Sequence, residues 1–309
     1  MEGLKKKKSK IVAFFSGRKG KQRIFISGML AWPIIHFLVF WLYVNIDAIF
    51  LAFRNEARGE WTLSNFKWLI KMFVEPAVIL DMNMAVRNTL ILFFWNMVVE
   101  LPIAVVLAYV FFKKLPGNKF FTICLYLPSI ISTAVMVAVY KSFLGSEGPF
   151  AQIFGQSWVY PITNPETSML SMLAYNLWTG YGLNIILFRS AMGRIPPEIF
   201  ESAAIDGITM FEELTKIILP LIWPTLSTMM LISISGVFGA SGPVLLFVGE
   251  WDAHDAGLMT VGHAMFLQYK VSGMVERAAA MGLFFTAISM PLVFLSRWLL
   301  TKVEGEYEY

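Results

Sequence analysis

The chain has 309 residues, of which 57% are hydrophobic and 15% are charged, with a formal net charge of +4 and a mean hydropathy of +0.64. Soluble globular domains carry roughly a quarter charged residues, so this composition excludes an ordinary soluble domain and indicates a membrane protein. A single cysteine, Cys124, excludes an intramolecular disulfide.

Residues 1–23 form a basic tail before the first long apolar run. Its basic residues are Lys5, Lys6, Lys7, Lys8, Lys10, Arg18, Lys19, Lys21 and Arg23. A nucleic-acid-binding arm is the alternative, but a basic tail beside a membrane helix is typical of a topology signal or of a contact with anionic lipid. We therefore expect membrane lipid, and no nucleic acid, as the partner of this tail. No cleavable signal peptide is predicted, because the first apolar run is too long and lacks a small-residue cleavage site.

Six apolar runs are long enough to cross a bilayer as helices, which takes about 20 residues each. They are residues 24–50, 88–112, 119–143, 168–192, 215–239 and 277–300, and residues 301–309 form a C-terminal tail. The predicted fold is an all-α membrane protein with six transmembrane helices.

The Lys and Arg residues predict the orientation, because they are more frequent on the cytoplasmic side of a membrane. An even number of spans places both termini on one side. The tails and loops on that side hold 17 Lys and Arg residues, and the loops on the opposite side hold 8. Both termini and loop 193–214 are therefore predicted to be cytoplasmic.

Reporter fusions test this orientation directly. We expect a reporter fused after Tyr309 to be active only in the cytoplasm and a reporter at residue 155 only outside, because the charge count places these positions on opposite sides. An external C-terminus would contradict the predicted orientation.

Two groups of ionisable residues raise alternative functions. Segment 240–276 contains Glu250, Asp252, His254 and Asp255, which suggests a metal site. The usual ligand spacing is missing, so a solvated loop is favoured and no metal is expected.

His36 and Glu100 lie at a similar depth in the first two spans and form a candidate pair. A buried, neutral Glu100 bonded to a carbonyl is the slightly favoured alternative.

Loop 193–214 is too polar for lipid and lies between the fourth and fifth spans. Pro196, Pro197 and Glu198 are typical of a helix start. Gly207 permits the left-handed geometry that ends a short helix, and Pro220 comes early in the following apolar run. The loop is predicted to form a short helix, a turn and the entry into a membrane helix.

The residues of this loop resemble a known family. Glu201-Ser202-Ala203, Asp206-Gly207 and Leu219-Pro220 stand at the spacing found in the permease subunits of bacterial ABC importers. Arg87-Asn88-Thr89-Leu90 and Tyr126-Leu127-Pro128 are further similarities, and nearly the whole chain is covered. The chain looks closest to the carbohydrate-type permeases of maltose and glycerol-phosphate importers, in the oligosaccharide branch. Ser202 and Ile208 depart from the family's alanines, so the substrate stays undetermined.

The resemblance implies a type I ABC importer permease fold in a bacterial inner membrane. Its implied partners are a second homologous permease, an ATPase dimer that holds ATP and magnesium, an extracellular solute-binding protein and a sugar substrate. Loop 193–214 is then the coupling helix that docks into the ATPase. Its coupling residues would be Glu201, Ser202, Ala203, Asp206 and Gly207. The chain itself has no phosphate-binding Gly-Lys-Ser/Thr loop and no catalytic motif, so no cofactor and no enzymatic activity are expected of it.

The fourth and fifth spans contain the residue types that recognise sugars, which offer apolar C–H faces and hydroxyl edges. The predicted substrate path consists of Tyr175, Asn176, Trp178, Tyr181, Asn184, Ser233 and Gly236. Asn176 and Asn184 are eight residues apart with Tyr181 near the same stripe, so several are expected on one helix face. Burial in a core or exposure to lipid is an equally good alternative for any one aromatic residue.

Two other classes of protein are alternatives to the importer permease. A secondary transporter driven by an ion gradient typically has inverted repeats and intramembrane acids, of which only Glu100 is present. It would also leave loop 193–214 without a purpose. A channel or membrane scaffold is disfavoured because no filter-like motif occurs.

Overall fold

A computed structural model describes residues 18–54, 59–76, 80–113, 116–145, 147–155, 164–239, 243–250, 252–271 and 273–304. Within these ranges the chain is helical, apart from turns, irregular residues and isolated bridge positions, of which Arg54 and Trp61 pair with each other. The helices, with π-helical segments marked η, are α2 (Arg18–His36), η1 (Phe37–Tyr43), α3 (Val44–Ala52), α4 (Ser64–Val74), α5 (Met82–Trp95), η2 (Asn96–Glu100), α6 (Leu101–Phe112), α7 (Asn118–Ile130), α8 (Thr133–Leu144), α9 (Pro149–Phe154), α10 (Ser168–Met192), α11 (Pro197–Ile205), α12 (Met210–Glu212), η4 (Glu213–Ile218), α13 (Leu219–Leu221), α14 (Trp223–Ser235), α15 (Val244–Val248), α16 (Val261–Phe266), η5 (Leu267–Val271) and α17 (Val275–Glu304). Most of the predicted basic tail (1–17) and residues 305–309 lie outside the described residues.

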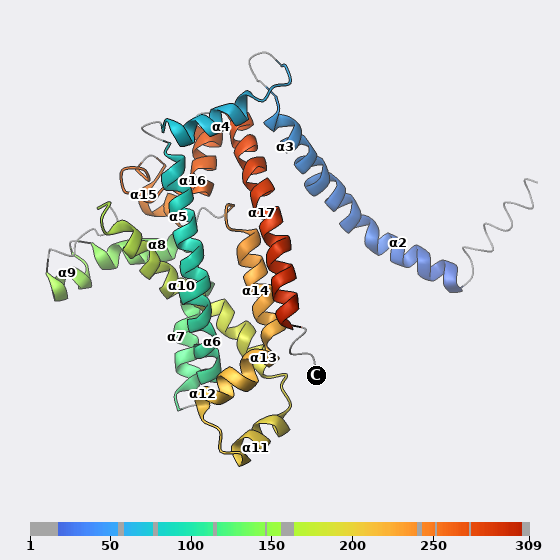
Figure 1. Cartoon of the computed structure of the whole chain (residues 1–309), viewed down its shortest axis with the longest axis vertical. Helices are drawn as coiled ribbons and strands as arrows, with labels where there is room; N and C mark the ends of the chain where they lie inside the picture. The colour runs from blue at the N-terminus through green and yellow to red at the C-terminus, as the bar shows by residue number, and fades with distance from the viewer. Residues whose placement is uncertain are drawn as a thin grey trace, which may run out of the picture.

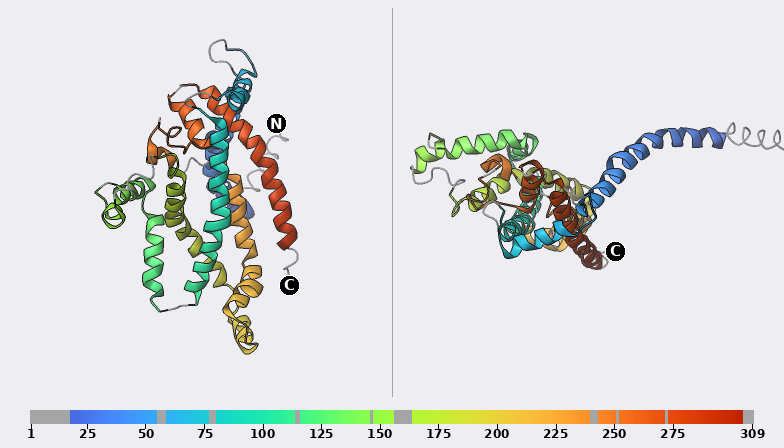
Figure 2. Two further views of the ribbon diagram at one scale, coloured as in Figure 1. Left: turned by 60° about the vertical axis from the view of Figure 1, so that its left-hand side comes forward. Right: turned by 90° about the horizontal axis from the view of Figure 1, so that it is seen from above.

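The N-terminal helix stands apart from the rest of the chain. α2, η1 and α3 run on from one another, and only α3 packs beside α17, while α2 projects away from the bundle (Figures 1 and 2). None of its most apolar window is buried against the other described residues. A lone apolar helix with all its backbone bonds made internally is suited to a lipid environment.

Among the described residues, three helices are long and apolar enough to cross a membrane: Phe25–Ala52, Met82–Phe112 and Val275–Val303. They correspond to the first, second and sixth predicted spans. The count rises to at most five if each of two bent helix pairs is one span. α10 has the bounds predicted for the fourth span, but it is not apolar enough to be counted. Six spans therefore stay a prediction, whereas at least three apolar spans are present.

The third predicted span is not one helix. α7 ends at Ile130 and α8 begins at Thr133, and the two arms of this pair are bent by 108°. Ile131 and Ser132 between them have extended backbone conformations. Pro128 weakens the helix just before the break, because it lacks an N–H and its ring crowds the carbonyl four residues earlier. The run 119–143, expected to cross the membrane as one helix, therefore forms two helices, which together make at most one broken span.

The fifth predicted span is also broken. The segment Met210–Leu221 and the helix Trp223–Ser235 meet at 71°. Pro220 lies near the start of α13 and Pro224 near the start of α14, positions where a missing N–H is tolerated. Residues 215–221 therefore run at an angle to the rest of the predicted span.

α10 occupies the centre of the bundle, in contact with α6, α7 and α14. Its fully buried Phe188 and Met192 belong to a core shared with α6, η4 and α14. A second core joins the start of α10 to α8, α15 and residues 253–258, and a third joins α4, α5, α16 and α17. The central position of α10 explains why it can be less apolar than a lipid-facing helix.

Asn88 and Thr89 attach the start of α5 to the segment before α16. The Asn88 side-chain amide donates to the carbonyls of Gly257 and Met259 at 2.8 and 2.9 Å. The Val261 N–H donates to the Thr89 hydroxyl at 3.0 Å. These bonds satisfy buried backbone groups of an irregular segment, which is costly to leave unsatisfied. The family-like Arg87–Leu90 stretch thus has a structural role here.

Candidate functional site

The short helix predicted in loop 193–214 is present as α11. Pro196 is its N-cap, Pro197 lies in its first turn, and Glu198 places a carboxylate near the positive end of the helix. These local preferences favour a helix that begins at this point.

The end of α11 is a Schellman motif. The Gly207 N–H bonds to the Ala204 carbonyl and the Ile208 N–H bonds to the Ala203 carbonyl. Gly207 has φ of +69°, a left-handed conformation that residues with a Cβ atom rarely adopt. Asp206, the C-cap residue, is exposed and has helical backbone angles.

α11 lies at one end of the molecule, opposite the end that carries α4 (Figure 1). Ala203 is buried at 5% exposure, whereas Glu201, Ser202, Asp206 and Gly207 are exposed. Large apolar side chains are exposed beside them, with Ile205 at 86% and Phe211 at 74%. The end of the molecule thus presents a carboxylate next to apolar groups that nothing in the described chain covers.

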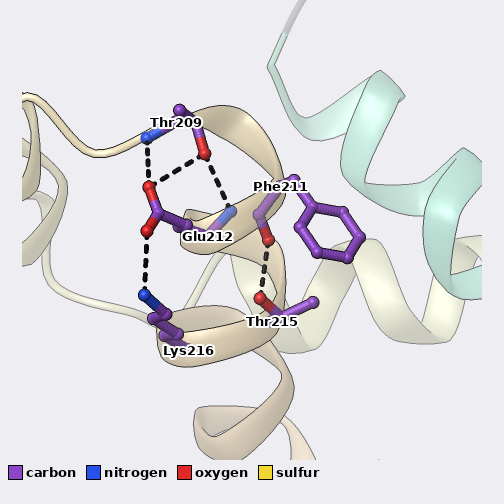
Figure 3. Close-up of polar contacts among 5 residues, drawn as sticks. All are labelled: Thr209, Phe211, Glu212, Thr215 and Lys216. Atoms are coloured by element: carbon purple, nitrogen blue, oxygen red, sulfur yellow. Dashed lines mark hydrogen bonds and ion pairs between the residues drawn. The ribbon is translucent and has the colours of Figure 1, made fainter.

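The turn after α11 is held by a capping box (Figure 3). The Glu212 N–H donates to the Thr209 hydroxyl, and the Thr209 N–H donates to the Glu212 carboxylate at 3.1 Å. Lys216 then bonds to the other oxygen of that carboxylate at 2.8 Å. This arrangement starts the next helix at a defined residue and so fixes the length of the connection from α11.

An ion pair connects η4 to the end of α6, and its lysine also lies near an aromatic ring of α11. Lys113 Nζ donates to Glu213 Oε2 at 2.7 Å and lies 5.5 Å from the centre of the Phe200 ring. Phe112 packs against the same ring, with centroids 5.3 Å apart. Sequence reasoning missed this contact, because its two charged residues are 100 positions apart and neither lies in a recognisable pattern.

A cavity of about 280 Å³ lies between α5, α10 and α14. Its lining residues are Thr89, Leu92, Phe93, Asn96, Asn176, Ile232, Ser233, Gly236 and Val237. Three predicted path residues, Asn176, Ser233 and Gly236, are therefore brought together from two different helices. Asn96 was missed by sequence reasoning, and its amide in an otherwise apolar helix was the available signal.

Asn96 occupies the centre of a short polar chain. The Ser233 hydroxyl donates to Asn96 Oδ1 at 3.1 Å, and Asn96 Nδ2 donates to Glu100 Oε2 at 2.9 Å. Asn96 and Glu100 are the first and last residues of η2, in which the Leu101 N–H bonds to the carbonyl five residues earlier. Pro102 explains why η2 has a wider, π-helical turn: proline has no N–H to donate to the carbonyl four residues before it.

The other predicted path residues lie elsewhere. Tyr175 is buried in the second core, with its ring 4.9 Å from that of Phe247. Tyr181 packs against the core that includes α6. Trp178 is 37% exposed. Asn184 is partly buried and does not line the cavity. The common face expected for Asn176, Tyr181 and Asn184 thus divides between different surroundings.

Glu100 has Asn96 as its hydrogen-bond partner, whereas the ring of His36, at the end of α2, lies 4.9 Å from the ring of Phe40 in η1. Neither the proposed pair nor a bond from Glu100 to a carbonyl is present among the described contacts. His254 lies 3.2 Å from the Asp255 carboxylate. Over the part of the chain that the structure describes, no group of three or more His, Cys, Asp or Glu residues could hold a metal ion.

The sequence of residues 23–306 matches the model of the family described as binding-protein-dependent transport system inner membrane component. The chain belongs to this family. It is therefore a permease of the bacterial inner membrane, and the resemblance seen in loop 193–214 extends over nearly the whole chain.

Relatives among these inner membrane components include sugar permeases. The chain is similar to the arabinooligosaccharides transport system permease protein AraP of Bacillus subtilis (strain 168), at 26% identity over 88% of this chain and 87% of that protein. It is also similar to the polygalacturonan/rhamnogalacturonan transport system permease protein YteP of the same organism, at 23% identity over 89% and 87% of the two chains.

A solved structure shares the fold of this inner membrane component. A bacterial ABC transporter involved in the import of the acidic polysaccharide alginate matches with a TM-score of 0.79 and 22% identity, over 92% of this chain and 98% of that one. The same kind of transporter has been solved in complex with an alginate pentasaccharide-bound periplasmic protein, with a TM-score of 0.80 and 21% identity over 93% and 97% of the two chains. The chain thus has a type I ABC permease-like fold.

Proposed function

We propose that this chain is one permease subunit of an ATP-driven importer that carries an oligosaccharide from an external binding protein into the cytoplasm. The observation that carries the proposal is the cavity between α5, α10 and α14, which places amide and hydroxyl groups inside an otherwise apolar bundle. The arabinooligosaccharide and polygalacturonan permeases among its relatives support a sugar chain as the cargo.

The chemistry of the cavity suits a sugar. Asn96, Asn176 and Ser233 offer hydrogen-bonding groups, while Leu92 and Phe93 offer apolar surface for the C–H face of a ring. The volume of about 280 Å³ is near the lower end of the roughly 300–1,000 Å³ typical of ligand pockets. A single ring of a longer chain is therefore the unit that we expect it to hold.

The importer would contain a second homologous permease, two copies of an ATPase that binds ATP and magnesium, and an external binding protein. ATP-driven closure of the ATPase dimer would move α11, and the cavity would open alternately to each side of the membrane, with both termini in the cytoplasm. The exposed apolar residues around Glu201 support a protein groove as the partner of α11. The alginate transporter solved with its periplasmic protein supports a binding-protein partner.

Glu201→Lys is expected to weaken the attachment of the ATPase while the permease pair stays folded and inserted. A charge-assisted hydrogen bond to an Arg or Lys of the ATPase is worth about 1.5–3 kcal/mol, and the substitution replaces it with repulsion. Co-purification of the ATPase with the permeases measures the effect. Glu198→Lys, which changes another exposed carboxylate of α11, is the matched control. Equal retention of the ATPase by wild type and Glu201→Lys would contradict the docking role of Glu201.

Asn176→Leu is expected to slow uptake about fivefold at saturating sugar-loaded binding protein, as the loss of one hydrogen bond of about 1 kcal/mol implies. Asn184→Leu is the comparison, because Asn184 was also predicted from sequence to line the path but lies on the same helix outside the cavity lining. Uptake of a panel of arabino-, galacturono- and malto-oligosaccharides into vesicles that contain the assembled complex measures both. Normal uptake by either variant, at normal expression, would remove that residue from the path, and no uptake of any panel sugar by wild type would contradict the proposed function.

A further inference from the structure

Glu100 is a buried carboxylate that the proposed transport cycle does not use. Only 4% of the residue is exposed, and it lies at the end of η2 within the apolar segment Met82–Phe112. A charged or polar group at such a depth is costly unless a partner satisfies it, and it commonly has a function. Its partner is one turn away on the same segment, since Asn96 Nδ2 donates to Glu100 Oε2 at 2.9 Å.

This bond determines which way the Asn96 amide faces. The amide turns its NH₂ group toward Glu100, because Glu100 Oε2 is the acceptor of this bond. The carbonyl oxygen of Asn96 then faces the opposite way, where it accepts from the Ser233 hydroxyl at 3.1 Å. Asn96 and Ser233 both line the cavity, so the cavity receives an acceptor oxygen with a second lone pair.

The carboxylate is also held from the side of α10. A Cβ atom placed on Gly180 would lie 2.7 Å from Glu100 Oε2, closer than real Cβ contacts come. Glu100 therefore fills the space that a glycine leaves on the helix facing it. The same helix carries Asn176 into the cavity four residues earlier, so Glu100, α10 and α14 are joined around one site.

We propose that Glu100 is a positioning residue for recognition of the transported sugar. It holds the Asn96 carbonyl toward the cavity, where that oxygen accepts a hydrogen bond from a sugar hydroxyl. Glu100 itself does not touch the sugar. The inference rests on the proposed function, because it takes an oligosaccharide as the cargo.

Glu100→Met and Glu100→Gln form the central test. Methionine removes the acceptor and frees the Asn96 amide to turn, whereas the carbonyl of glutamine can still accept from Asn96 Nδ2. Uptake is measured in vesicles that contain the assembled complex, with the same binding protein at a saturating concentration throughout. The quantity compared is the ratio of two uptake rates, that of the panel sugar carried fastest and that of the panel sugar carried slowest. We expect Glu100→Met to reduce the ratio of the two rates about fivefold, the effect of one misdirected hydrogen bond. Glu100→Gln should keep the ratio within about twofold of wild type.

Two glycine variants separate positioning from packing. Gly180→Ala pushes the carboxylate from its place and is expected to reduce the ratio as Glu100→Met does. Gly182→Ala introduces a comparable clash on the same helix, 2.5 Å from Ser129 Oγ, and should leave the ratio unchanged even if it lowers the yield of the complex.

Equal slowing of both sugars by Glu100→Met would show that Glu100 serves only to pack the helices, and would overturn the inference. A Glu100→Gln variant as impaired in discrimination as Glu100→Met would overturn it too. If wild type carried none of the sugars, both the proposed function and this inference would fall. If wild type carried a panel sugar but Glu100→Met left the ratio of the two uptake rates unchanged, the inference alone would fall and the proposed function would stand.

Discussion

Gly207→Val is expected to reduce coupled sugar uptake more than tenfold while the permease stays inserted and assembled. Gly207 has φ of +69° at the end of α11, where its N–H and that of Ile208 close the helix. A β-branched residue in this conformation is strained by about 1–3 kcal/mol, and the turn relaxes by losing the bonds to Ala203 and Ala204. α11 would then no longer hold its angle to the rest of the chain.

The measurement is sugar uptake together with sugar-stimulated ATP hydrolysis by the reconstituted complex. We expect hydrolysis to continue without matching uptake. Gly207→Ala should give a smaller loss, and Gly193→Ala is its matched control, because Gly193 opens the same loop with φ of −68° and an added Cβ there would make an ordinary contact of 3.4 Å. Coupled uptake by Gly207→Val at the wild-type rate would show that loop 193–214 does not transmit the movement.

Lys113→Met is expected to destabilise the permease by about 2–3 kcal/mol and to loosen the connection between α6 and loop 193–214. The Glu213 side chain is only 10% exposed and the Lys113 side chain 27% exposed, so the methionine leaves a carboxylate largely out of water without its partner. The estimate stays below the 3–5 kcal/mol of a fully buried pair because water still reaches the lysine. The Phe200 ring also loses its cation, so α11 is held less firmly.

Thermal unfolding of the purified complex and sugar-stimulated hydrolysis measure the two effects of Lys113→Met. The double variant Lys113→Met with Glu213→Met should recover most of the stability, because no charge is then left buried. Lys71→Met is the control, since the Lys71–Glu75 pair has side chains that are 63% and 68% exposed and such pairs contribute about 0.5 kcal/mol or less. Equal effects of Lys113→Met and Lys71→Met would contradict the structural role of the buried pair.

Local sequence signals predicted the short helix inside loop 193–214. Pro197 and Gly207 mark the two ends of α11, because one residue suits the first turn of a helix and the other its left-handed close. The length of the apolar runs likewise predicted the first, second and last spans, and the majority of their boundaries agree with the structure to within a few residues. These features depend on neighbouring residues alone, so no knowledge of the fold was needed.

Helix packing decided whether a long apolar run breaks at its proline and in which direction the chain continues. A proline within an apolar run is compatible with a kink or with a complete break, and the packing around it selects between them. The break after Pro128 turned one predicted span into α7 and α8, and the break at Ile222 separated the entry segment from α14. The sequence in each case contained the weak point but not the direction of the chain after it.

Composition and residue spacing were enough to establish a helical membrane protein with a short polar helix between two apolar segments, and to indicate the family of transport components. Which side chains meet depends on how the helices pack. Lys113 and Glu213, or Asn96 and Ser233, are more than ninety residues apart and become neighbours through helix packing. Tyr175 and Asn176 are adjacent in sequence, yet one is buried in a core and the other lines the cavity, because successive residues of a helix point about 100° apart.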